Sequence, residues 1–333
     1  MKKNKENNIR RFFFSLLGII MITAPCLLRA GDIKLSLETE FTVFYDKNYS
    51  PPFSFQFRET KLFLDTYISE HSNALIEYVM HEDFKRAVVE RAYFIQRDLL
   101  FNSQLTFGQF HSPFGYYNAF TVTRSMTKNV ALSPDGILPA FKLRSVDTGV
   151  LWDLPLEPMS FSIAIVNGNN ASGLRDDNNF KDFIGHWMYD FDQFQFGLNG
   201  YYGKKNSLDP NGTVIQYADV NVAAIGVETM VLFDKAVVAG EVIAQKYALM
   251  KSIGGYVMMN YDLSDLMKTL RYVSRFEIFN PNTVVKNNIR IQCAQGFFYT
   301  LDRGYKLKCE YILNIGHTKQ ELDKMFIELE YEL

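Results

Sequence analysis

Alternation with a period of two runs through almost the whole chain after its first thirty residues. In segment after segment, apolar side chains occupy every second position and polar or small side chains occupy the positions between them. This period predicts β-strands with one apolar face. Many of the segments are close to the length of about 9–11 residues that a tilted strand needs to cross a bilayer. About sixteen segments are expected, near 33–45, 54–69, 74–81, 87–96, 103–110, 144–153, 159–167, 181–190, 193–203, 219–233, 236–246, 252–262, 269–279, 288–300, 305–314 and 324–333.

The connections between these segments differ in length according to their order. Nearly every second connection is short, and those between are mostly longer and polar, although the ones near 82–86 and 247–251 are short as well. A barrel inserted through one membrane has tight turns at one end and long loops at the other. A soluble sheet packed on a core is the alternative, but it gives no reason for such sorting. The prediction is therefore an all-β fold, a single closed antiparallel transmembrane β-barrel of about sixteen strands.

The N-terminus has the form of a secretory signal peptide. Five Lys and Arg residues precede the apolar run from Phe12 to Leu28, which is the usual arrangement of such a leader. A single transmembrane anchor is the alternative, but the run is short for that role and Pro25 interrupts it. We therefore expect residues 1–30 to be a signal peptide and residues 31–333 to be the barrel domain. No apolar stretch long enough for a membrane-spanning helix follows.

Charge and cysteine usage limit the possible partners. The segment 31–333 holds 29 Lys and Arg against 36 Asp and Glu, a net charge of −7. An acidic chain without a basic stripe argues against nucleic acid as a partner. Two cysteines, Cys293 and Cys309, remain. If their segments form a hairpin that turns at 302–304, the two residues share a face but lie about four residues out of register, too far apart for a disulfide. A shifted turn would still allow one.

Strand parity also predicts which side chains face the lumen. Charges on the lipid face are strongly disfavoured, whereas a wet lumen accepts them. Basic residues then gather on the thirteenth to fifteenth strands, and acidic residues gather on the sixteenth and the first. Two interpretations stay open: a transverse field across the pore, or neighbouring ion pairs that only stiffen the wall. The lumen-facing set is Arg271, Arg275, Glu277, Arg290, Gln292, Lys306, Lys308, Glu310, Glu328, Glu330, Glu332, Glu38 and Glu40.

The connection from His111 to Leu143 is far longer than ordinary loops, and loops of that length are usually functional or disordered. Its many aromatic and aliphatic residues make it too apolar for a disordered segment. We expect this third outer loop to fold into the barrel and narrow the pore, with Arg124, Lys128, Asp135 and Lys142 lining the constriction. The alternative is a loop that covers the mouth or a subunit interface.

Three stretches resemble the phosphate-selective porin O and P family of Gram-negative outer membranes. They are ERAYFIQRDLLFNSQLTFGQFHSPFGYYN at 90–118, RSVDTGVLW at 144–152 and SFSIAIVNGN at 160–169. The resemblance implies a sixteen-stranded trimeric porin whose third loop enters the channel. It also implies anion selectivity from a ladder of lumen arginines and lysines. The candidates that match by position are Arg124, Lys128, Lys142 and Arg144.

The last strand resembles the C-terminal signal by which outer-membrane barrels are passed to their insertion machinery. Hydrophobic residues stand at the last, third-last, fifth-last and seventh-last positions, and Tyr331 is third from the end. We therefore expect the bacterial outer membrane as the location. The expected partners are outer-membrane lipid, the barrel-insertion machinery, further copies in a homotrimer, and small polar solutes or anions.

The expected function is passive diffusion of small hydrophilic solutes or ions, including anions such as phosphate. An enzyme is not expected, because the five histidines are scattered over loops and strand ends. No serine elbow, metal-binding His-Glu motif or phosphate-binding glycine loop is present in the sequence. We therefore predict no catalytic residue, no metal and no cofactor. The alternative function is that of a non-conducting barrel acting as an adhesin or structural surface protein.

Overall fold

The structure is a computed structural model of the 333-residue chain. It describes residues 33–46, 53–81, 87–115, 146–168, 180–208, 214–247, 250–285, 289–301, 305–315 and 324–332. The predicted signal peptide, residues 1–30, lies outside these ranges and stays a prediction. Most of the third outer loop predicted at 111–143, namely residues 116–143, also lies outside them.

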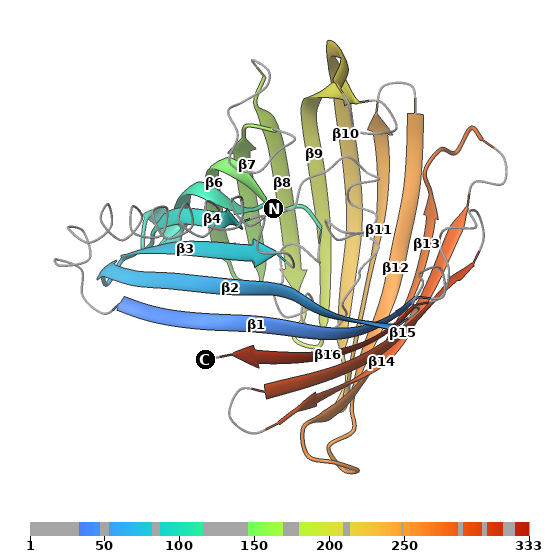
Figure 1. The fold of residues 1–333 in the computed structure, drawn as a ribbon. Helices are drawn as coiled ribbons and strands as arrows, with labels where there is room; N and C mark the ends of the chain where they lie inside the picture. The colour runs from blue at the N-terminus through green and yellow to red at the C-terminus, as the bar shows by residue number, and fades with distance from the viewer. Residues whose placement is uncertain are drawn as a thin grey trace, which may run out of the picture.

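Sixteen antiparallel strands form one closed barrel (Figure 1). Each strand pairs with its neighbours in sequence, and β16 pairs with β1, so the sheet has no open edge. The predicted fold class is confirmed, and each predicted segment corresponds to one strand. The strands are β1 (Ile33–Asp46), β2 (Phe53–Ser69), β3 (Ser72–His81), β4 (Ala87–Gln96), β5 (Gln104–His111), β6 (Val146–Leu156), β7 (Met159–Val166), β8 (Asp182–Asp190), β9 (Phe194–Leu208), β10 (Val214–Leu232), β11 (Ala236–Tyr247), β12 (Met250–Asp262), β13 (Leu270–Asn280), β14 (Arg290–Thr300), β15 (Tyr305–Ile315) and β16 (Lys324–Glu332).

The two faces of the sheet differ as the alternation predicts. On β8, Phe183 points outward with 47% of its surface exposed, whereas the next residue, Ile184, points inward and is 2% exposed. On β13, Phe276 and Ile278 are exposed, whereas Glu277 between them is buried. Large apolar side chains therefore cover the outside, whereas the inside carries polar side chains such as Glu277 together with buried apolar ones such as Ile184. An apolar outer face is the arrangement of a barrel surrounded by lipid.

Most of the short connections lie at one end of the barrel, although the connections β3–β4 and β11–β12 at the other end are short as well. The main group includes the turns at 157–158, 191–193 and 233–235, and a short 3-10 helix, η1 (Leu100–Asn102), lies between β4 and β5. The longer connections lie at the other end, but the sorting is less strict than expected. β9 continues to Leu208 and β10 already begins at Val214. The connection between them, predicted to span Lys204 to Ala218, is therefore much shorter. Among the described residues, no helix has the length and apolar character needed to cross a membrane.

An irregularity between β3 and β4 shows how an outward polar side chain is satisfied. The register shifts between Glu77 and Tyr78, which leaves Glu90 as the extra residue of a bulge. The side-chain amide of Gln109, on β5, donates to the backbone oxygens of Val89 and Glu90 at 3.0 and 2.7 Å. Gln109 is 8% exposed. The bulge thus provides acceptors for an amide that would otherwise face the surroundings of the barrel.

The two cysteines of the barrel are free. Cys293 of β14 pairs in register with Leu313 of β15, and Cys309 of β15 pairs with Phe297 of β14. The two cysteines therefore lie on the same face but four residues out of register, as the hairpin model predicted. Their separation along the strands is too large for a disulfide.

Candidate functional site: the lumen wall

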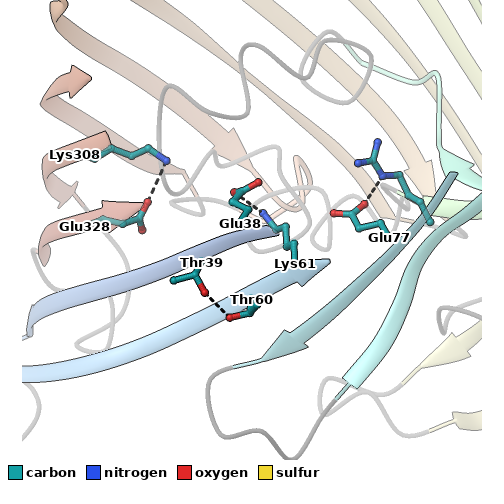
Figure 2. A network of polar contacts seen from close by, with 8 residues as sticks. Glu38, Thr39, Thr60, Lys61, Glu77, Lys308 and Glu328 are labelled. Carbon is teal, nitrogen blue, oxygen red and sulfur yellow. Dashed lines mark hydrogen bonds and ion pairs between the residues drawn. The ribbon is translucent and has the colours of Figure 1, made fainter. Parts of the chain in front are cut away.

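Charged side chains on β15, β16 and β1 to β4 form pairs across neighbouring strands (Figure 2). The ammonium of Lys308 lies 3.1 Å from Glu328 Oε1. The ammonium of Lys61 lies 3.3 Å from Glu38 Oε1, and both side chains are about one-fifth exposed, at 20% and 22%. These groups line the inside of the barrel and are partly accessible to water. Opposite charges at facing positions of antiparallel strands stabilise the pairing.

Arg91 of β4 and Glu77 of β3 form a third pair of this kind. The arginine side chain is 16% exposed and the carboxylate is 5% exposed. In each of the three pairs a positive side chain faces a negative one on the neighbouring strand. Neither sign of charge therefore dominates this part of the wall. The separation into a basic patch on β13 to β15 and an acidic patch on β16 and β1 is therefore reduced by local pairing. Lys306 also lies in register with Glu330, although the side chain of Glu330 lies outside the described part.

Arg275, predicted to line the pore, lies on the lumen face of β13 in a buried polar cluster. It forms an ion pair with Glu277, and the two side chains are 0% and 1% exposed. Its Nη2 donates to Gln292 Oε1 on β14 at 2.9 Å, and Gln292 Nε2 donates to Asn314 Oδ1 on β15 at 2.8 Å. This chain of polar contacts links three strands. Its burial gives it a role in holding the wall together.

The other predicted lining residues lie in different settings. Arg271 has the same parity as Arg275 but is exposed, close to the connection at 263–269 between β12 and β13. Arg290 is exposed at the opposite end, where β14 begins. Lys306 is half-buried on β15. The structure thus spreads these basic residues over the height of the barrel and does not gather them into one ring. The four candidates Arg124, Lys128, Lys142 and Arg144 lie outside the described residues.

The start of the third outer loop enters the lumen. Phe114, which follows β5, is 1% exposed, and its ring packs edge-on against Tyr201 of β9 with centroids 6.3 Å apart. Gly115 has a φ of +84°, and a Cβ at this residue would lie 2.8 Å from Glu241 Oε1 on β11. Because β9 and β11 do not neighbour β5 in the sheet, the chain must leave the wall and cross the interior to reach them.

A buried polar cluster on β8 to β10 was not predicted. His186 Nε2 lies 2.6 Å from Glu228 Oε1, and Asn199 Nδ2 donates to Glu228 Oε2 at 2.9 Å. The three residues are 8%, 1% and 3% exposed. Glycines make room for the cluster, because a Cβ at Gly197 would lie 2.6 Å from Glu228 Cγ, and one at Gly226 would lie 2.2 Å from Asn199 Oδ1. The side chains therefore lie flat against the wall.

A second carboxylate on this side is held by its own partners. Asp182, at the start of β8, is 0% exposed. It accepts a hydrogen bond from the hydroxyl of Tyr201, and one from the backbone N–H of Lys204 at 3.0 Å. These hydrogen bonds hold the Asp182 side chain against the wall, and its carboxylate adds to the negative charge on this side of the lumen.

The wall from β5 to β12 differs in charge from the rest of the barrel. Its lumen-facing carboxylates come from β6, β8, β10 and β11. Among the side chains described on β5 to β12, no Lys or Arg occupies a lumen-facing position. Basic residues in the described lumen lie on β13 to β15 and on β1, β2 and β4. A charge difference across the pore was one of the two interpretations of the sequence. The structure has such a difference, but the acidic side of the lumen is formed by β5 to β12 and not by β16 and β1 as expected. The carboxylates are Asp147, Asp153, Asp182, Glu228 and Glu241.

Within the described residues, no group of three or more His, Cys, Asp or Glu side chains is arranged to hold a metal ion. Comparison with known sequences gives no assignment either: no family model matches the chain, and no curated protein matches it.

Comparison with solved structures identifies the fold. OmpF of Salmonella typhi, in complex with daunomycin, matches with a TM-score of 0.71 and 11% identity over 92% of this chain and 99% of that one. OmpT of Vibrio cholerae, in a trimer form, matches with a TM-score of 0.66 and 11% identity over 91% of this chain and 100% of that one. An anion-selective porin from Comamonas acidovorans matches with a TM-score of 0.64 and 9% identity over 91% of this chain and 99% of that one. The chain therefore has the fold of the sixteen-stranded outer-membrane porins.

Proposed function

We propose that this protein is an outer-membrane porin that lets small hydrophilic solutes diffuse passively through its lumen. The observation that carries the proposal is the contrast between the two faces of the wall. Apolar side chains are exposed outward, whereas the partly exposed ion pair Lys61–Glu38 and the more buried pair Lys308–Glu328 lie inside. A lumen lined with charged groups holds water, and water-filled lumens conduct small solutes. No covalent chemistry is required.

The location and processing follow from the same proposal. Residues 1–30 direct export and are removed, and the last strand is recognised by the barrel-insertion machinery of the bacterial outer membrane. We further propose a homotrimer, which is supported by the trimer form of the structurally similar OmpT. The contact with outer-membrane lipid is made by the outward apolar side chains.

The solute class depends on the balance of two sets of charges. The resemblance to phosphate-selective porins supports anions, with Arg124, Lys128, Lys142 and Arg144 as the lining residues. The rest of the proposed lining comprises Arg271, Arg275, Arg290, Lys306, Lys308, Glu328 and Glu330. The carboxylates on β6 to β11 act in the opposite direction. We propose that the three basic residues of the third loop, together with Arg144 directly after it, set the sign of the selectivity, because fixed charges act most strongly where the path is narrowest.

Planar-bilayer recording of the purified protein tests the proposal. Stepwise increases in current are expected, and a sample heated to unfold it is the control that should give none. Reversal potentials in a salt gradient then give the ion preference. Replacing Arg124 and Lys128 together by Gln should shift that preference towards cations. A folded protein that inserts into the bilayer without current would contradict the porin assignment and favour the surface-contact alternative.

A further inference from the structure

Three lysines on the outer face of the barrel gather at its long-loop end. Lys204 of β9, Lys246 of β11 and Lys251 of β12 have the parity of outward neighbours such as Tyr202 and Ile253. The strands β9 to β12 follow one another in the wall (Figure 1). Among the side chains described on the outer face of β8 to β12, no Asp or Glu accompanies these lysines. The outer surface therefore carries an unbalanced positive charge at one membrane face.

Lys246 and Lys251 lie directly opposite each other in the strand pairing. Both are exposed, and within the described part of the chain neither ammonium makes a hydrogen bond or an ion pair. Like charges at facing positions destabilise a strand pair. Long lysine side chains at the end of a strand extend their ammonium groups towards the membrane surface. An anion bound between the two ammonium groups there would offset their repulsion.

Aromatic side chains mark the level of the membrane surface beside these lysines. The ring of Phe180 packs edge-on against the rings of Phe183 and Tyr202, with centroids 6.1 and 5.8 Å apart. The ammonium of Lys204 lies 5.3 Å from the centroid of the Phe180 ring. Aromatic girdles of membrane barrels lie where the hydrocarbon meets the headgroups. This cluster therefore places Lys204 at the depth of lipid headgroups.

A notch in the apolar surface lies one row of outward residues deeper. Gly185 of β8 and Gly200 of β9 face each other at outward positions, and a Cβ at either residue would meet no atom within 4 Å. The residues that flank the two glycines in this row, Ile163 and Ile225, are 49% and 61% exposed. Two neighbouring side chains are therefore missing from the lipid-facing wall, and the space is open to a hydrocarbon chain.

The strand register joins the notch to the lysines. The next row of outward residues on the long-loop side runs through Phe183, Tyr202, Ala223, Lys246 and Lys251. Neighbouring strands are about 4.8 Å apart, so β9 and β11 are separated by about 10 Å, and the two rows lie about 7 Å apart along the strands. One lipid molecule with two or more acyl chains covers both distances.

We propose that this surface of β8 to β12 binds one anionic, phosphate-bearing lipid of the outer leaflet. The phosphate contacts the ammonium groups of Lys246 and Lys251, with Lys204 beside them, and one acyl chain lies in the notch at Gly185 and Gly200. Basic side chains attract anionic headgroups, and a gap among apolar side chains accepts an acyl chain, so the two features together specify a lipid. The inference rests on the proposed outer-membrane location but not on conduction.

Native mass spectrometry of the protein purified in detergent tests the headgroup contact. The added lipid is phosphatidylglycerol, which is anionic, or phosphatidylcholine, which carries a phosphate but no net charge. Preferential retention of phosphatidylglycerol is expected. The double variant Lys246→Gln with Lys251→Gln should lower this retention on the order of tenfold, because each lysine near an anionic headgroup adds to the attraction. Lys235→Gln with Lys268→Gln, the control, removes the same charge at the short-turn end and should leave retention unchanged. Equal retention by the two double variants would overturn the proposal.

A second variant tests the notch. Gly185→Leu adds a side chain whose Cβ meets no neighbour, and it leaves every charge in place. It should also lower the retention of phosphatidylglycerol. The control is Val242→Leu on the outer face of β11, where the parent side chain is 54% exposed, and it should have no effect. Unchanged retention in Gly185→Leu would mean that no acyl chain occupies the notch and would overturn the two-part site.

Inorganic phosphate separates a lipid site from a site for free anions. An excess of inorganic phosphate should leave the bound phosphatidylglycerol in place, and its displacement would overturn the lipid assignment. Planar-bilayer currents of the same variants show separately whether the protein conducts. Failure of the porin function and failure of the lipid site are therefore distinguishable.

Discussion

The buried pair between Arg275 and Glu277 gives the sharpest energetic prediction. The change is Arg275→Met, which preserves much of the side-chain volume but removes the charge. It leaves Glu277, 1% exposed, without the guanidinium that faces it, and it removes the donor to Gln292. Removing one partner of a buried ion pair costs about 3–5 kcal/mol. With a urea dependence of about 3 kcal/mol/M, the unfolding midpoint should fall by about 1–2 M.

Urea unfolding of the barrel in lipid vesicles, followed by tryptophan fluorescence, measures this change. Arg271→Met is the matched control, because Arg271 is exposed on the same strand and should alter the free energy of unfolding by only about 0.5 kcal/mol. The double variant Arg275→Met with Glu277→Leu should recover most of the loss, since replacing a buried pair by apolar residues is often neutral. Equal effects of Arg275→Met and Arg271→Met, with no recovery in the double variant, would refute the reasoning.

Three further predictions concern other parts of the wall. Arg271→Glu should shift the reversal potential towards cations without a loss of stability, and an unchanged potential would place this side chain off the permeation path. Gly197→Val should destabilise the barrel by about 1–3 kcal/mol in urea unfolding, because the new side chain meets Glu228; a variant as stable as the wild type would show that the cluster on β8 to β10 is loosely packed. Phe114→Ala should lower the unfolding free energy by about 3 kcal/mol, since its ring is buried against Tyr201, and an unchanged urea midpoint would mean that the loop is not anchored there.

The strands were predictable because each one carries its own signal. Every strand alternates between lipid-facing and lumen-facing side chains, so the period of two persists without reference to the rest of the chain. Hairpin register was predictable where the turn is short: the four-residue offset of Cys293 and Cys309 follows from the position of one turn. The bounds of β9 and β10 were less accurate, because polar residues such as Lys205 and Asn206 continue as strand beyond the apolar pattern.

The contacts inside the lumen were not predictable, because they join residues of the same parity without any local signal. His186 and Glu228 meet across β9, 42 residues apart, and only the register of two strand pairs places them together. Their one trace in the sequence is Gly197 and Gly226 at lumen-facing positions, where missing side chains mark space taken by neighbours. Phe114 contacts Tyr201 across the interior of the barrel, and the alternation along a strand carries no information about such a contact.

The account depends on lipid outside the wall and water inside it. Adjacent residues on β15 test this most directly, because Leu307 points outward, 39% exposed, and Lys308 points into the lumen. With both native cysteines of the barrel replaced by alanine, Leu307→Cys and Lys308→Cys are each treated in membranes with a charged, water-soluble thiol reagent. We predict labelling at 308 and protection at 307. Labelling at 307 with protection at 308, or equal labelling at both, would contradict the assignment of the two faces.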